Sequence, residues 1–167
     1  MKQLSHHNTN FTKRTFPVTL VCDNVTNAPN IGSLFRIADA FGVEKLIFCG
    51  QDISLGRRMT KTSRSTENSV DFEVKEDVIE VCKELRIQGH AIISLEITDT
   101  SKPIHTFTFP KERPMAIFVG DENSGVSEEV LKLSDDIILI NMFGQNSSMN
   151  VVQATNICLY EIVKQLL

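Results

Sequence analysis

No stretch of this 167-residue sequence approaches the roughly 18 consecutive apolar residues that a membrane-spanning helix requires. The first residues, Met-Lys-Gln-Leu-Ser-His-His, also lack the apolar core of a signal peptide. We therefore expect a cytoplasmic protein that does not span a membrane. Hydrophobic residues make up 41% of the sequence and charged residues 23%, which is typical of a folded chain with one sizeable core.

The sequence also lacks the cysteine and histidine spacings of metal sites. Its four cysteines are scattered and form no C-x-x-C pair, and its four histidines form no ligand motif. Three of the cysteines fall in apolar segments, where a thiol behaves as a small hydrophobic group. We therefore expect neither a bound metal nor a disulfide.

Two common nucleotide-binding fingerprints are absent. No G-x-G-x-x-G follows a predicted strand, and no G-x-x-x-x-G-K-[ST] occurs in the sequence. These absences argue against a Rossmann dehydrogenase and against a P-loop nucleoside triphosphatase.

What the sequence does contain is an alternation of strand-like and helix-like segments. Apolar, often β-branched runs predict strands at residues 17–22, 45–49, 70–74, 90–95, 115–119 and 137–140. Apolar residues three or four apart predict helices at 30–41, 76–88 and 148–167. A short helix is expected to follow Ser127, with the Ser127 side chain as its N-terminal cap. This alternation indicates an α/β fold, a parallel sheet flanked by helices. Residues 1–16 are polar and aperiodic, so we expect an N-terminal arm followed by a single domain over residues 17–167.

Three polar loops follow predicted strands, at residues 27–36, 120–125 and 141–150. Ligands of open α/β sheets bind beyond the carboxyl ends of the strands, so these loops are expected to share one site. In the first loop, amides and Arg36 stand at a strand-to-helix junction, where they can bind an anion such as a phosphate.

Each candidate residue of these loops also has a structural interpretation. Asn27 and Asn30 can be turn formers or helix caps, and Ser148 can cap the last helix. Arg36 can simply cover core residues with its stem, and Glu122 can neutralise the helix that follows it. Asn150 is expected inside the first turn of the last helix, where its poor helix propensity favours a role for its amide.

A basic stretch runs from Gly56 to Thr66 in a chain whose net charge is −4. The overall charge argues against a nucleic-acid partner, whereas this stretch carries four cations and no acid: Arg57, Arg58, Lys61 and Arg64. Taken alone, the stretch is a solvated loop without strong periodicity. It becomes a phosphate-binding segment if the remaining motifs require one.

Together the three loops resemble the motifs of the SpoU (TrmH-like) family of RNA ribose methyltransferases, in the SPOUT superfamily. The first motif reads Asn27-x-x-Asn30-x-Gly32-x-x-x-Arg36. The second reads Gly120-x-Glu122-x-x-Gly125-Val-Ser, and the third reads Ile140-x-Met142-x-Gly144-x-x-x-Ser148-x-Asn150-Val. The resemblance spans residues 17 to 165 in the right order. Two residues depart from it: Asn141 replaces the usual proline, and Met149 replaces the usual leucine.

The resemblance implies a C-terminal trefoil knot, a homodimer, and S-adenosylmethionine bound in the knot. It further implies transfer of a methyl group to a ribose 2′-hydroxyl of RNA. By matching position, the cofactor pocket would be lined by Gly120, Ile140 and Met149, with Leu95 added at the end of its strand. The residues implied in catalysis are Arg36, Asn30, Glu122, Ser148 and Asn150.

The resemblance also leads to expectations about how the RNA substrate is bound. A guanidinium with a pKa above about 12 is a poor base, so we expect Arg36 to clamp an RNA phosphate and orient the nucleotide. The four cations of the basic stretch are then expected to contact the RNA backbone. We expect tRNA rather than rRNA, because no separate RNA-recognition domain is evident in the sequence. The alternatives are an rRNA methyltransferase, a non-catalytic cofactor-binding RNA-binding module, and an enzyme that modifies small molecules or proteins.

Overall fold

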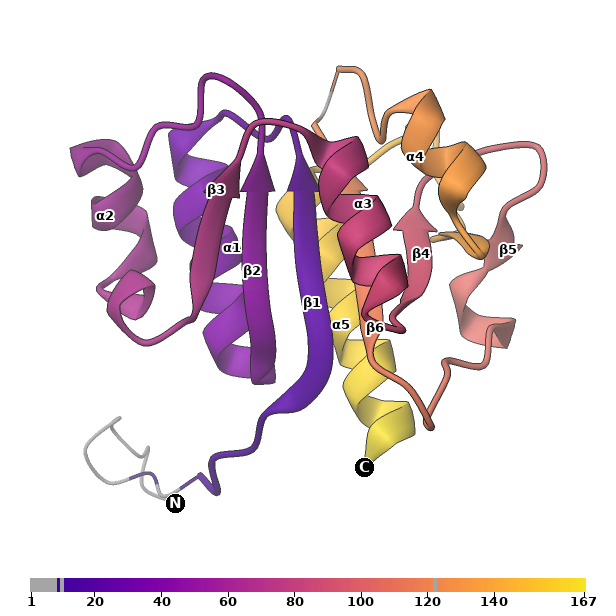
Figure 1. The fold of residues 1–167 in the computed structure, drawn as a ribbon, viewed down its shortest axis with the longest axis horizontal. Helices are drawn as coiled ribbons and strands as arrows, with labels where there is room; N and C mark the ends of the chain where they lie inside the picture. Colours follow the sequence, from indigo (N-terminus) through magenta and orange to yellow (C-terminus); the bar gives the residue numbers. More distant parts are fainter. Residues whose placement is uncertain (1–8, 10, 122) are drawn as a thin grey trace.

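The computed structural model describes residue 9, residues 11–121 and residues 123–167. Its centre is a seven-stranded sheet in the order β3-β2-β1-β6-β4-β7-β5, in which every pair of neighbouring strands is parallel (Figure 1). The strands are β1 (Phe16–Asp23), β2 (Val43–Cys49), β3 (Phe72–Lys75), β4 (Ala91–Leu95), β5 (Lys102–Pro103), β6 (Met115–Gly120) and β7 (Asp136–Leu139). The expected parallel α/β sheet is confirmed.

Helices cover both faces of this sheet. The helices α1 (Ala28–Phe41), α2 (Arg57–Ser63) and α5 (Val151–Leu166) lie on one side, and α3 (Val78–Ile87) and α4 (Glu128–Leu133) lie on the other (Figure 1). Two short 3-10 helices, η2 (Thr66–Asn68) and η3 (Ile104–Thr106), complete the connections. Among the described residues, no helix combines the length and the apolar character that crossing a bilayer would demand.

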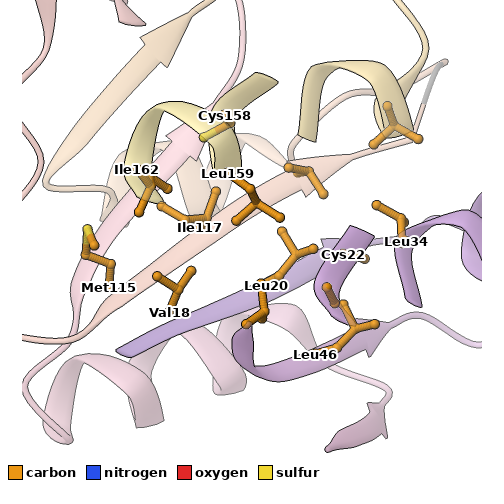
Figure 2. Packing of buried hydrophobic residues seen from close by; sticks show 14 of the residues in the cluster. Val18, Leu20, Cys22, Leu34, Leu46, Met115, Ile117, Cys158, Leu159 and Ile162 are labelled. Carbon is orange, nitrogen blue, oxygen red and sulfur yellow. The ribbon is translucent and has the colours of Figure 1, made fainter. Parts of the chain in front are cut away.

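The two faces follow from the alternation of side chains along a strand. Leu20 of β1 and Ile117 of β6 belong to the larger core cluster, together with Leu159 of α5 (Figure 2). Their neighbours Val21 and Phe118 point to the opposite face and belong to the second cluster, under α3 and α4. Buried on both faces, the central strands read as continuous apolar runs, which is why the sequence indicated them clearly.

Four local predictions differ from the structure. The basic stretch expected to lack periodicity contains α2, because a seven-residue helix that buries only Met59 and Ser63 leaves little hydrophobic pattern. The connection after β4 contains the two-residue strand β5. Helix α1 begins at Ala28 rather than at Asn30. Ser127 occupies the N-cap position of α4 but makes no capping bond with its side chain.

The N-terminal arm ends where β1 begins, at Phe16, and residues 1–8 and 10 lie outside the described part. Arg14 lies over the ring of Phe16, with its guanidinium carbon 4.6 Å from the ring centre. The same guanidinium donates a hydrogen bond to the carbonyl oxygen of Leu166 at 3.4 Å. These contacts place the end of the arm beside the last turn of α5.

Candidate active site

A cavity of about 720 Å³ opens beyond the carboxyl ends of β4, β6 and β7, beside the start of α5. Most of its lining comes from three loops, through residues 95–98, residues 119–121 and 123–126, and residues 139, 140, 142 and 148–150. The lining residues are Leu95, Glu96, Ile97, Thr98, Val119, Gly120, Asp121, Asn123, Ser124, Gly125, Val126, Leu131, Leu139, Ile140, Met142, Ser148, Met149, Asn150, Val151 and Ala154. The parallel sheet therefore gathers segments that are far apart in the sequence into one site, as expected for this fold class.

This cavity brings together six of the residues that the sequence proposed. The four cofactor candidates line it, as do two of the catalytic candidates: Leu95, Gly120, Ile140, Met149, Ser148 and Asn150. Glu122 lies outside the described residues, although its neighbours on both sides line the cavity. Asn30 and Arg36 are not among the described lining residues.

Two glycines of the second motif are explained by close backbone approach. A Cβ on Gly120 would lie 1.9 Å from the carbonyl carbon of Gly125 and 2.3 Å from the backbone nitrogen of Val126. Gly125 has a φ of +65°, and a Cβ there would lie 2.3 Å from Oε2 of Glu96. The loop over the cavity therefore folds back on β6 so tightly that both positions require glycine.

Two carboxylates at this end of the sheet escaped the sequence analysis. Asp23, at the end of β1, is only 7% exposed, and its Oδ2 accepts the backbone N–H of Ser127 at 2.8 Å. Glu96, after β4, accepts the N–H of Val126 through Oε2 at 3.0 Å and that of Ile97 through Oε1 at 2.8 Å. No motif marked either residue, because their partners lie far away in sequence or belong to the backbone. The one feature of the sequence that could have indicated them is that each acid directly follows an apolar run predicted to be a strand.

Asp121 organises the same loop locally. Its Oδ1 accepts the backbone N–H groups of Asn123 and Ser124, at 2.6 and 2.7 Å. Its Oδ2 accepts the hydroxyl of Ser124 at 3.0 Å and the side-chain amide of Asn24 at 3.4 Å. Partial burial by itself would raise the pKa of Asp121, but these hydrogen bonds outweigh it and lower the pKa. The carboxylate form is therefore the one that holds the loop.

The first and third motifs meet through two asparagines. The side-chain amide of Asn150 donates to Oδ1 of Asn30 at 3.3 Å, across 120 residues of sequence. Asn150 is the N-cap of α5, and its Oδ1 accepts the N–H of Val152 at 2.9 Å. The prediction that Asn150 lies inside the first turn of this helix is wrong, because the helix begins at Val151. The capping role considered for Ser148 also fails, since Ser148 precedes the cap by two residues and is exposed.

A second hollow, of about 480 Å³, lies between α1 and α2. Arg36 lines it together with three of the four cations of the basic stretch, and the full lining is Pro29, Arg36, Arg58, Lys61, Thr62 and Arg64. Arg57 is exposed and is not among these residues. The described lining thus carries four positive side chains and no carboxylate. Such a concentration of charge is suited to a phosphate.

Close helix packing holds this hollow in place. A Cβ on Gly32 of α1 would lie 2.5 Å from the carbonyl oxygen of Met59 and 2.9 Å from the backbone nitrogen of Ser63, both in α2. At the end of α2, Arg64 and Ser65 both adopt left-handed backbone angles, with φ of 52° and 70°. Two consecutive non-glycine residues in this region are energetically unfavourable and typical of functional sites.

The four cysteines are buried. Burial raises the pKa of Cys158 and, chiefly by the same cause, that of Cys49 to about 12. Their thiols are therefore protonated at neutral pH and belong to the core rather than to the site.

The chain is similar to known RNA-modifying enzymes. The sequence profile of the SpoU rRNA Methylase family matches residues 17–160. The chain is 28% identical over 153 residues to the tRNA (guanosine(18)-2'-O)-methyltransferase of Aquifex aeolicus, covering 92% of this chain and 72% of that enzyme. It is 32% identical over 152 residues to the 23S rRNA (guanosine-2'-O-)-methyltransferase RlmB of Yersinia pestis, covering 89% of this chain and 60% of that enzyme.

Solved structures agree with the sequence comparison. The crystal structure of the A. aeolicus TrmH/SpoU tRNA modifying enzyme matches with a TM-score of 0.82 and 28% identity, over 92% of this chain and 77% of that one. The SpoU methyltransferase AviRb of Streptomyces viridochromogenes, solved with AdoMet, shares the fold with a TM-score of 0.78 and 23% identity, over 96% of this chain and 64% of that one. The family profile covers most of the chain and all three motifs, and the chain therefore belongs to the SpoU rRNA Methylase family.

Proposed function

We propose that this protein is a methyltransferase that uses S-adenosylmethionine to methylate a ribose 2′-hydroxyl of RNA. One observation carries the proposal. The large cavity gathers all four cofactor candidates from three separate loops, and the Asn30–Asn150 hydrogen bond joins its wall to the helix that bears Arg36. A cofactor site and a phosphate-binding hollow are thereby adjoined through one pair of side chains.

The cavity fits the proposed cofactor in size and in chemistry. A volume of about 720 Å³ lies within the range of small-molecule sites, roughly 300–1,000 Å³. Its wall combines apolar side chains such as Leu95 and Ile140 with the backbone of Gly120, and the close approach at Gly120 fixes that backbone. We propose that these three residues and Met149 hold the cofactor, largely through backbone groups. When bound, S-adenosylmethionine supplies an electrophilic methyl group on a positively charged sulfur.

The acceptor side is assigned to the residues around α1. Arg36 is exposed and lines the basic hollow, so we assign it to a substrate phosphate that it clamps through two parallel N–H groups. Asn30 and Asn150 position the ribose between this clamp and the cavity, with Ser148 at the cavity rim. Glu122 is assigned to the organisation of the loops. The proton of the hydroxyl then passes to the phosphate or to a transiently neutral Arg36.

The remaining cations extend this surface for RNA. We propose that Arg57, Arg58, Lys61 and Arg64 contact the RNA backbone, and that this contact makes binding dependent on salt. Replacing all four by glutamine should weaken RNA binding and leave cofactor affinity unchanged, as measured by filter binding and calorimetry. Equal loss of both affinities would indicate misfolding.

We further propose the trefoil knot and a homodimer. In support of the knot, β7 follows β4 and β5 in the chain but lies between them in the sheet, and the chain then continues into α5 beneath β4 and β6. In support of the dimer, α5 exposes Ile157 at 39% and Tyr160 at 61%, whereas its other face is buried in the core through residues such as Cys158, Leu159 and Ile162. Analytical ultracentrifugation tests the dimer, and substitution of both residues by lysine should yield monomers.

Transfer of radiolabelled methyl from S-adenosylmethionine tests the proposed function. We expect label in RNA and none in protein, with tRNA preferred, and nuclease mapping should place it on a ribose. The RlmB relative makes rRNA the second candidate, so both RNAs are assayed in parallel. Label in protein or in small molecules would contradict the proposal, and cofactor binding without any transfer would favour a non-catalytic RNA-binding module.

A further inference from the structure

The two hollows of the site carry opposite charges. Among the described residues that line the large cavity, the charged ones are Glu96 and Asp121, and none is a lysine, an arginine or a histidine. The hollow beside α1 has the reverse character, with four cations and no acid in its described lining. A molecule that binds in the large cavity therefore meets negative side chains, whereas an anionic substrate is attracted to the other hollow.

The backbone over the large cavity offers no binding site for an anion either. Successive N–H groups in a loop commonly form a nest for phosphate. Here the N–H groups of residues 123–127 all have acceptors within the protein: Asp121 Oδ1 for Asn123 and Ser124, the Asp121 carbonyl for Gly125, Glu96 Oε2 for Val126, and Asp23 Oδ2 for Ser127. Three carboxylates thus accept four of these five N–H groups and a backbone carbonyl accepts the fifth, so none is left for a phosphate.

Glu96 is an acid whose position at the cavity wall is fixed by backbone hydrogen bonds. It directly follows Leu95, and both of its oxygens accept backbone N–H groups, from Ile97 and from Val126. Its carboxylate also lies where a side chain on Gly125 would begin, so it is packed against the glycine of the second motif. The position of this charge is therefore fixed before any ligand binds, and no reorganisation is needed to present it.

We propose that Glu96 is a specificity-determining residue that favours the positively charged methyl donor over its demethylated product. This inference rests on the proposed function of the cavity. S-adenosylmethionine carries a positive sulfonium, and S-adenosylhomocysteine has a neutral thioether in its place, so the two differ by one charge. A fixed carboxylate in the cavity stabilises the first and gains little from the second. After transfer the thioether is neutral, so this attraction no longer helps to retain the product.

Isothermal titration calorimetry on the full chain tests the proposal with both ligands. In Glu96→Gln the amide oxygen can still accept the N–H of Val126, and the negative charge is lost. We expect the Kd of S-adenosylmethionine to rise by about three- to tenfold, the effect of one partly screened charge, and that of S-adenosylhomocysteine to change by less than about twofold. Glu80→Gln, an exposed site on α3 outside both hollows, removes the same charge and should change neither Kd.

Two further measurements separate the possible outcomes. Equal weakening of both ligands in Glu96→Gln, or no weakening, would overturn the inference and leave the proposed function intact. Glu96→Asp keeps the charge, and it should keep the ratio of the two Kd values even if a shorter side chain lowers stability. Failure of the unaltered protein to bind either ligand would refute the cofactor proposal itself, and this inference with it.

Discussion

Gly120→Ala is the substitution for which the structure predicts the largest effect on the site. The added Cβ would lie 1.9 Å from the carbonyl carbon of Gly125 and 2.3 Å from the nitrogen of Val126, and both are backbone atoms. The loop must therefore move away from β6. That movement breaks the hydrogen bonds from Val126 to Glu96 and from Ser127 to Asp23. Hydrogen bonds to charged groups contribute about 1.5–3 kcal/mol each, so we expect a loss of about 3–6 kcal/mol in the free energy of unfolding.

Urea unfolding followed by far-UV circular dichroism measures this loss, and calorimetry should show that S-adenosylmethionine no longer binds at micromolar concentrations. Gly144→Ala is the matched control, because a Cβ there meets nothing within 4 Å. It should change stability by less than about 0.5 kcal/mol. If Gly120→Ala lost less than about 1 kcal/mol and kept its cofactor affinity, the close approach of the loop would not be what holds the cavity.

Three further predictions concern other parts of the site. Gly32→Ala should push α2 away from α1, because its Cβ would lie 2.5 Å from the carbonyl oxygen of Met59, and filter binding should show weaker RNA binding with unchanged cofactor affinity. Arg36→Lys keeps the charge but loses the guanidinium fork, so turnover with RNA should fall at least about tenfold, and full turnover would refute the phosphate clamp. The pKa of Asp121 is lower in the folded protein than in the unfolded chain. Its carboxylate therefore stabilises the fold above about pH 4, and this contribution is lost as the pH falls through the pKa of the folded state. Urea unfolding between pH 3 and pH 7 should therefore show Asp121→Asn less stable than the unaltered protein at pH 7, with a difference that shrinks on acidification.

Much of the architecture was predictable from local sequence pattern. The central strands are buried on both faces, so β6 reads as an unbroken apolar run, and α1 repeats its apolar residues with helical spacing. The rule that ligands bind at the carboxyl ends of parallel strands predicted that three polar loops share one site. The second and third loops line one cavity, whereas the first loop contacts the third through Asn30 and Asn150, and its Arg36 lines a separate hollow. The cavity lined by Gly120, Ile140 and Met149 lies at that edge of the sheet.

Other features escaped prediction because their cause is not local. Helix α2 buries two residues only, so its pattern is too weak to detect, and its position depends on contact with Gly32. The prediction that Asn150 lies inside the first turn of α5 was wrong because the apolar pattern does not fix the residue at which a helix begins. The helix begins at Val151, because the side chain of Asn150 caps it by accepting the N–H of Val152.

The sequence by itself determined the alternating strands and helices, the edge of the sheet at which the cavity opens, and the residue types of the three motifs. The tertiary structure decided which side chains and backbone groups come into contact. Asp23 reaches Ser127 across 104 residues, Glu96 reaches Val126 across 30, and Arg36 shares a hollow with Arg64 of the basic stretch. These contacts depend on the order of strands in the sheet and on how closely the backbone folds over itself. Neither property leaves a periodic signal in the chain, because each arises when segments distant in sequence pack side by side.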